Sequence, residues 1–210
     1  MAYKRNQVEE AISRTIGEKG VRPSSELRIR VKRLLDLDRG LEINPRSKDP
    51  ELANFAFYSS AAPGKGSEIL FSAYEAFALL TGIRLLKHSW PQHFVVTMLR
   101  RVRHKLEAEH RNILKQDFRT LFDEERVSKE ARSGHIAVDN ADPVFLLIVS
   151  DDASSADRPY AMIFRGQLAA FTFQMDRIGR SCTWNELVSP AWRLQNNLVA
   201  SLPRQRGRST

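Results

Sequence analysis

SAYEAFALLTGIRLLKHSWPQHF, residues 72–94, predicts two helices joined by a tight turn, and the rest of the chain is organised around this pair. Ser72 opens a capping box, Ser-x-x-Glu, in which the serine hydroxyl accepts a backbone N–H and the glutamate reaches back to the capping residue. The helix that follows is expected to end near Lys87. Ser89 opens a second capping box, Ser-x-x-Gln, with Pro91 in the first turn. Proline is tolerated there because the N–H groups of the first turn have no hydrogen-bond partner within the helix. A second helix is therefore expected from Pro91.

The second helix is expected to be long, running from Pro91 to Gln116. Its apolar residues recur at spacings of four, three and four, which is typical of a seam that packs against a partner helix. The seam consists of Val95, Leu99, Val102 and Leu106. Its partner is either a helix of this chain or the same helix of a second subunit, and we predict a homodimer formed through the seam. The strongly charged residues 117–132 are interpreted as a helical extension.

Two more helices are expected before this pair. The first covers residues 5–17, where a valine and two isoleucines repeat every four residues. The second follows a serine cap at residue 24 or 25. It carries an apolar stripe of Leu27, Val31, Leu34 and Leu35. Residues 40–66 are rich in proline and glycine and are predicted to form a loop, with a short helix near residues 52–57.

The composition changes in the last third of the chain. Val144–Val149 is an apolar run typical of a buried strand. Residues 160–165 and 168–174 are predicted to form a β-hairpin that turns at Gly166. A closing helix is expected to begin at Ser189-Pro190.

The expected fold class is therefore α+β. A mainly helical, helix-turn-helix-like region is expected at residues 1–132, with a boundary at the turn near residue 133. A small β-hairpin domain with a closing helix follows at residues 133–203, and a basic tail at residues 204–210.

Composition limits the partners and the compartment. The 210 residues carry a formal net charge of +8, with a pI near 9.9, which favours a polyanionic partner such as nucleic acid or an anionic membrane surface. Cys182 is the only cysteine in the sequence, which excludes an internal disulfide and a zinc site built on cysteine pairs. The N-terminal sequence lacks the apolar core of a signal peptide, and the longest apolar run is far shorter than a membrane span. We expect a cytoplasmic protein with no membrane partner.

Basic residues gather on two of the expected helices. On the second helix they are Arg28, Arg30, Lys32 and Arg33. On the long helix they are Arg100, Arg101 and Arg103. A helix with one apolar stripe packs inward and leaves cations on its other faces for phosphate groups. The alternative is a solvated surface whose charges form salt bridges, which the nearby Glu107 and Glu109 favour for the long helix. We predict that one of these two helices contacts double-stranded DNA.

No pattern in the sequence indicates catalysis, a metal or a cofactor. Gly64-Lys65-Gly66-Ser67 is similar to part of a phosphate-binding loop, but that pattern needs a glycine where Ser59 stands. The five histidines lack the His-Glu-x-x-His spacing of a zinc site. The neighbouring carboxylates Glu124-Glu125 and Asp151-Asp152 point apart on a helix and are usually solvated in a turn. We expect a protein that is not an enzyme.

Residues 71–106 resemble the latter half of the DNA-binding domain of MerR-type winged-helix regulators. The shared order is an aromatic residue, a capped helix, a short turn and a second helix, carried here by Phe71, Leu85-Leu86-Lys87, Trp90-Pro91, Val95, Val96 and Leu99. The resemblance implies a regulator that uses a helix-turn-helix or winged-helix element. The Thr-Leu-Arg-Tyr-Tyr run found near the start of that family is absent from this sequence, and Arg28–Arg33 occupies the corresponding place.

Two functional hypotheses follow from these patterns. The favoured one is a DNA-binding protein, a transcriptional regulator that acts as a homodimer. The alternative is a protein-interaction adaptor with a ligand-sensing or enzymatic C-terminal domain, in which the positive charge serves solubility. Salt-dependent retention on DNA would favour the first, whereas a concave site with perturbed acids in the C-terminal part would favour the second.

Overall fold

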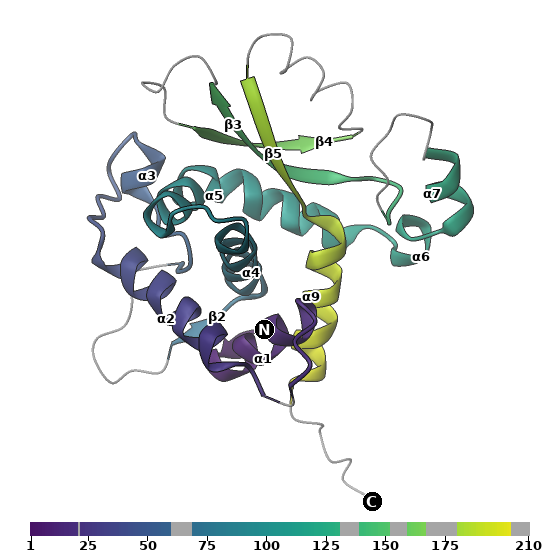
Figure 1. The fold of residues 1–210 in the computed structure, drawn as a ribbon, viewed down its shortest axis with the longest axis horizontal. Helices are drawn as coiled ribbons and strands as arrows, with labels where there is room; N and C mark the ends of the chain where they lie inside the picture. The colour runs from purple at the N-terminus through teal and green to yellow at the C-terminus, as the bar shows by residue number, and fades with distance from the viewer. Residues whose placement is uncertain (21, 60–68, 131–138, 152–158, 167–179, 203–210) are drawn as a thin grey trace, which may run out of the picture.

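The computed structural model has a layer of packed helices with a small antiparallel β-sheet on one side of it (Figure 1). It describes residues 1–210 except 21, 60–68, 131–138, 152–158, 167–179 and 203–210, so the predicted basic tail lies outside the described residues. The predicted α+β class is confirmed. The described elements are β1 (Tyr3–Lys4), α1 (Arg5–Thr15), α2 (Ser25–Gly40), α3 (Pro50–Ala53), β2 (Leu70–Phe71), α4 (Ala73–Lys87), α5 (Gln92–Lys115), α6 (Phe118–Leu121), α7 (Glu124–Glu130), β3 (Val144–Asp151), β4 (Tyr160–Arg165), β5 (Arg180–Glu186) and α9 (Val188–Ala200).

Helix α4 lies at the centre of the helical layer, and its first turn is the capping box that the sequence predicts (Figure 1). The Ser72 hydroxyl accepts the N–H of Glu75 at 3.2 Å, and the Glu75 carboxylate accepts the N–H of Ser72 at 2.6 Å. Gly82 faces the two helices that pack on α4. An added Cβ there would lie 3.2 Å from Leu34 of α2 and 3.5 Å from Leu99 of α5. The missing side chain therefore lets both helices approach α4 closely.

The second predicted capping box is wrong. The residue that caps α5 is Pro91, and no side chain accepts a hydrogen bond from the first turn of that helix. Ser89 instead lies in the turn between α4 and α5, with a φ of 65°, and its N–H donates to the carbonyl of Leu86 at 3.1 Å. The tight turn places Ser89 outside the helix, so its hydroxyl is not in the position from which a cap acts.

The predicted helical extension is confirmed as helical within residues 118–130, but it does not continue α5, and residues 131–132 lie outside the described residues. Helix α5 ends at Lys115, and Gln116 is extended. Asp117 starts a new helix, α6, because its carboxylate accepts the N–H of Arg119 at 3.0 Å. An aspartate cap favours a helix start over a continuing helix, and the charged segment forms α6 and α7 instead.

The apolar seam of α5 is buried inside the chain. Its four residues are at most 5% exposed: Val95, Leu99, Val102 and Leu106. Helix α5 is contacted by α2, α3, α4, α9 and β4, so the partners of the seam come from the same chain. The seam is therefore not a dimerisation surface, and the prediction of a homodimer through it is wrong. Apolar spacing requires a partner but does not specify which chain supplies it.

Strand β3 lies between β4 and β5 and runs antiparallel to both. The predicted buried strand at Val144–Val149 is confirmed as part of β3. Its side chains alternate between the two faces of the sheet. Val144, Leu146 and Ile148 belong to the same core as the helices, whereas Phe145 and Leu147 pack in a smaller cluster. One face of the sheet therefore closes the helical core.

The predicted β-hairpin is only partly described. Its first strand is β4, which pairs with β3, and Gly166 follows it with a φ of 112°. Its second strand, residues 168–174, lies outside the described residues. Strand β5 was not predicted, because its sequence, RSCTWNE, is mostly polar and does not alternate with buried apolar residues.

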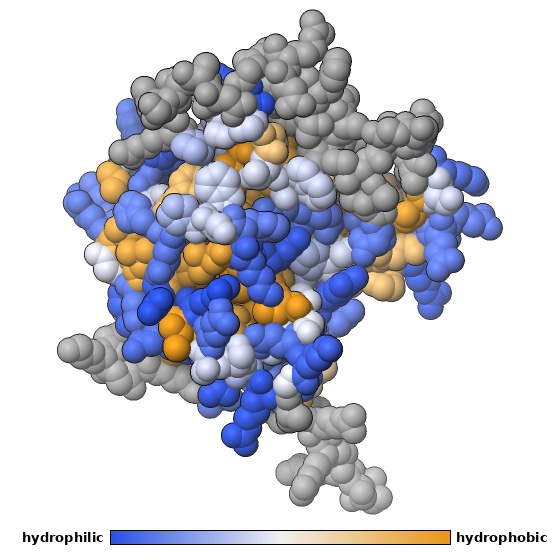
Figure 2. Space-filling view, in the orientation of Figure 1, coloured by the Kyte–Doolittle hydropathy of each residue, from blue (hydrophilic) through white to orange (hydrophobic). Residues whose placement is uncertain are grey.

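The closing helix is confirmed as α9, and it packs along α1 at the opposite end of the sequence (Figure 1). Val188, Leu194 and Leu198 of α9 share one hydrophobic cluster with Val8 and Ile12 of α1. The predicted boundary near residue 133 falls outside the described residues, and the described residues on both sides of it contribute to this cluster. Figure 2 shows hydrophilic residues over most of the viewed face, with apolar residues visible between them near its middle.

His110 of α5 is a buried histidine that belongs to this core. Its ring stacks on Phe77 of α4 with a centroid distance of 4.6 Å. Burial, together with the nearby charge of Arg111, lowers the pKa of His110 from 6.5 to about 4. The folded protein therefore keeps His110 neutral at pH values at which the unfolded chain protonates it.

We expect this histidine to make the protein less stable in mild acid. The unfolded chain binds the proton below pH 6.5, so the stability that His110 contributes is complete above that pH and is lost as the pH falls toward 4. At pH 5 the loss is about 2 kcal/mol relative to neutral pH. Urea unfolding of the wild type and of His110→Phe at pH 5 and at neutral pH measures this loss. Between the two pH values, the difference in unfolding free energy between the two proteins should shift by about 2 kcal/mol in favour of the variant at pH 5. Parallel pH profiles would contradict the assignment.

Candidate functional site

Helix α2 presents three exposed cations, Arg28, Lys32 and Arg33, which we call the α2 basic face. Within the described part of the chain, none of the three forms an ion pair or a side-chain hydrogen bond. They lie outside the buried stripe that holds α2 against α4 and α5. Arg30, the fourth predicted cation, pairs with Glu26 one turn earlier at 2.5 Å, so its charge is already matched.

Arg100 is not a nucleic-acid contact, which corrects the prediction. Its side chain is 1% exposed. The Nε atom donates to the carboxylate of Asp38 at 2.7 Å, and Nη2 donates to the carbonyl of the same residue at 2.5 Å. The Nη1 atom donates to the carbonyls of Glu42 at 2.9 Å and Glu51 at 3.3 Å. All of its nitrogens are occupied in fixing the last turn of α2 and the segment after it to α5.

Arg103 is a second buried arginine with a structural role. It is 7% exposed and donates to the carbonyls of Phe55 at 2.7 Å and Ala56 at 3.3 Å, while its guanidinium lies 5.2 Å from the centre of the Tyr74 ring. Arg101 points outward, but it pairs with the carboxylate of Glu51 at 2.6 Å. Of the two predicted groups, only the one on α2 therefore leaves cations without a partner among the described residues.

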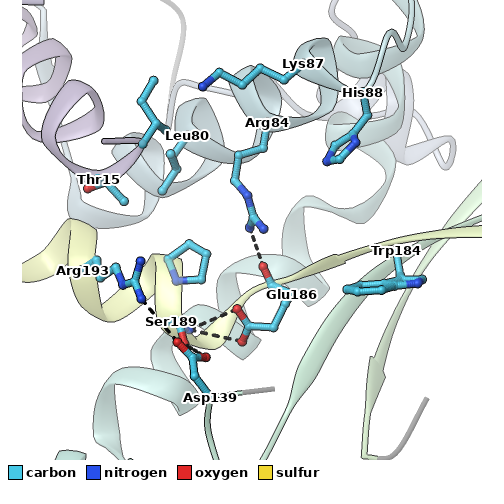
Figure 3. Close-up of a pocket in the computed structure, with 12 residues that line it drawn as sticks. Thr15, Leu80, Arg84, Lys87, His88, Asp139, Trp184, Glu186, Ser189 and Arg193 are labelled. Carbon is cyan, nitrogen blue, oxygen red and sulfur yellow. Dashed lines mark hydrogen bonds and ion pairs between the residues drawn. The ribbon is translucent and has the colours of Figure 1, made fainter. Parts of the chain in front are cut away.

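A pocket opens between the helical layer and the sheet (Figure 3). Its volume is about 610 Å³, which is within the usual range for small-molecule sites. The ends of α1 and α4 form one side, and β5 and the start of α9 form the other. The lining residues are Thr15, Ile16, Leu80, Arg84, Lys87, His88, Asp139, Trp184, Glu186, Ser189, Pro190 and Arg193.

Arg84 is the best-positioned cation of this pocket. It comes from α4 and points toward β5, where its Nη1 atom donates to the backbone carbonyl of Glu186 (Figure 3). That carbonyl is its one hydrogen-bond acceptor among the described residues. Burial lowers the pKa of Arg84, and the negative charge of Glu186 opposes this shift.

Glu186 lies beneath Arg84 in Figure 3, and its carboxylate caps the start of α9. Its carboxylate accepts the N–H groups of Val188 at 2.6 Å and Ser189 at 3.2 Å, which caps the start of α9, and the side-chain amide of Asn140 at 3.1 Å. Burial raises its pKa to about 7, although these hydrogen bonds and the charge of Arg84 favour the ionised form. Glu186 is thus only partly charged at neutral pH.

The remaining lining groups make the pocket cationic on one side and aromatic on another. Lys87 is exposed at the rim one turn from Arg84. Arg193 of α9 pairs with Asp139 at 3.3 Å, and both side chains are more than half exposed. Trp184 of β5 lines the far side and is 39% exposed. The arrangement offers hydrogen-bond donors, positive charge and a ring face, which suits the binding of an anion attached to an apolar group.

These pocket residues were missed from the sequence, although one signal was present. Most of the residues around Arg84 in α4 are apolar, and Arg84 follows the buried Leu80 by four residues, which is one helical turn. A cation in phase with a buried face has to reach a polar partner or a cavity. Glu186 and Trp184 gave no such signal, because β5 itself was not predicted.

The described residues contain no cluster of three or more histidine, cysteine or carboxylate side chains that could hold a metal ion. Among these residues, no helix is both long and apolar enough to cross a membrane. Comparison with protein families, with curated proteins and with solved structures finds no match to this chain.

Proposed function

We propose that the protein binds double-stranded DNA through the α2 basic face and acts in transcriptional regulation. The observation that carries the proposal is the contrast between two groups of cations. The cations of α5 form hydrogen bonds and ion pairs within the chain, whereas Arg28, Lys32 and Arg33 have no partner among the described residues. Three solvated cations on one helix face suit contact with successive phosphates of a duplex.

The packing of α2 supports docking of the helix as a rigid unit. Ser24 caps its start by accepting the N–H of Leu27 at 3.1 Å. The stripe on its inner side is buried against α4 and α5, so the basic face is held in a fixed direction. The transcriptional role rests on the resemblance of residues 71–106 to MerR-type regulators, and these residues include β2, α4 and part of α5. Self-association through the α5 seam is not part of the proposal, because that seam is buried.

DNA binding of this kind is expected to weaken steeply with salt. Each neutralised phosphate contributes about −0.9 to the slope of log affinity against log salt concentration, so three contacts give a slope near −3. Raising the salt from about 50 to 200 mM should then weaken binding about 40-fold. Fluorescence anisotropy of a labelled duplex, titrated with the protein at both concentrations, measures the slope.

Two results of that titration would refute the proposal. The first is absence of binding at low salt, because the electrostatic component is strongest there. The second is tight binding with a slope near zero, because the contact would then not be made by cations and phosphates.

A further inference from the structure

We propose that the pocket between α4, β5 and α9 binds a small molecule that carries a carboxylate or phosphate group, with Arg84 as the anchor of that group. The site is separate from the α2 basic face, and the inference does not rest on DNA binding.

The first argument is the state of the Arg84 guanidinium. An arginine has five N–H donors, and buried arginines are normally satisfied by several acceptors. Arg100 illustrates this, with four contacts to carbonyl and carboxylate oxygens. Arg84 is half-buried, has a single acceptor among the described residues, the backbone carbonyl of Glu186, and lines an open cavity. Its other donors are available for an oxyanion, which a guanidinium binds in a bidentate manner.

The second argument is the charge around that guanidinium. Lys87 adds a cation at the rim of the pocket. Of the two acids in the lining, Asp139 is occupied by Arg193 and by the hydroxyl of Ser189. Glu186 is occupied by the start of α9 and is only partly ionised at neutral pH. Neither acid forms an ion pair with Arg84, although the charge of Glu186 acts on it, and the lining holds three cationic side chains against these two acids.

The third argument is the shape and composition of the remaining wall. A cavity of about 610 Å³ is much larger than an oxyanion alone. Ile16, Leu80, Pro190 and the exposed ring of Trp184 give it an apolar part. The ligand therefore combines an oxyanion with an apolar or aromatic body, which packs against the tryptophan.

Benzoate and phenyl phosphate serve as probes, with uncharged benzamide as the control. Isothermal titration calorimetry with the full chain should give a dissociation constant on the order of 1 mM or tighter for at least one of the two anions, and none measurable for benzamide. The two anions separate a carboxylate ligand from a phosphate ligand. Quenching of tryptophan fluorescence that disappears in Trp184→Phe places the probe in this pocket.

Three variants test the anchor. Arg84→Gln should weaken binding of the preferred anion about tenfold, because a charge-assisted hydrogen bond is lost. Lys87→Gln should weaken it by a smaller factor, and Arg111→Gln, an exposed arginine of α5, should leave it unchanged. If Arg84→Gln does not fold, Lys87→Gln and Trp184→Phe decide the outcome, since both positions are exposed. Binding of neither anion, or equal binding of benzamide, overturns the proposal.

Discussion

Arg100→Met is expected to destabilise the protein by about 3–5 kcal/mol, because it leaves the Asp38 carboxylate buried and without its cation. Asp38 is 0% exposed. Besides Arg100, its carboxylate accepts the N–H groups of Ala56 at 3.0 Å and Phe57 at 2.9 Å. The arginine therefore joins α5 to α2 and to the segment that precedes β2. A loss of this size is a large part of the total stability of an ordinary domain.

Chemical denaturation of the wild type and of four variants tests this expectation. Asp38→Asn should lower the free energy of unfolding by a similar amount. The double variant should lose less than the sum of the two single losses, because both single changes remove the same Arg100–Asp38 interaction. Arg101→Gln is the matched control. Its ion pair with Glu51 is at the surface, so its loss should cost no more than about 1 kcal/mol. A loss for Arg100→Met as small as that of the control would show that the buried pair does not stabilise the fold.

Local signals in the sequence were sufficient to predict most helices. The capping box at Ser72, the serine cap of α2 and the apolar repeat of α1 all act within one or two turns, and each of these helices forms as expected. The apolar run of β3 was equally clear, because a strand buried on both faces needs no polar alternation. The α+β class follows from these elements alone.

The tertiary roles of the α5 residues could not be predicted in the same way. The spacing of Val95, Leu99, Val102 and Leu106 correctly indicated a packing face, but the partners of that face are distant in the sequence. Arg100 and Arg103 follow Val96 by four and seven residues, and all three are buried. That phase was a readable sign that these arginines face inward. Spacing alone does not separate the two groups, because Arg28 and Lys32 precede the buried Leu35 of α2 by seven and three residues and are nevertheless exposed.

The pocket was beyond the reach of local patterns. It combines the end of α4 with β5 and α9, which are separated from α4 by about a hundred residues of sequence. Glu186 acts as a cap for α9 only because β5 ends directly before that helix.

Reversal of two charges on the α2 basic face is the most direct test of the proposed DNA binding. Arg28→Glu/Arg33→Glu removes two phosphate contacts and adds two repulsions, so affinity for a duplex at low salt should fall about a hundredfold or more. Both side chains are exposed and without partners among the described residues, so stability should change by no more than about 1 kcal/mol.

Arg119→Glu/Arg126→Glu is the matched control for this variant. Its residues lie on α6 and α7, well away from α2, and both are exposed (Figure 1). It lowers the net charge of the protein by the same amount as the α2 variant. Any effect of overall charge is therefore the same in the two proteins, and only a local contact distinguishes them.

The measurement is fluorescence anisotropy of one labelled duplex titrated with the wild type and with the two folded double variants at the same low salt concentration. The proposal predicts near-complete loss of binding for Arg28→Glu/Arg33→Glu and an affinity close to that of the wild type for Arg119→Glu/Arg126→Glu. Equal affinities for the two variants would contradict it, because the DNA would then respond to the total charge of the protein and not to the face that α2 presents.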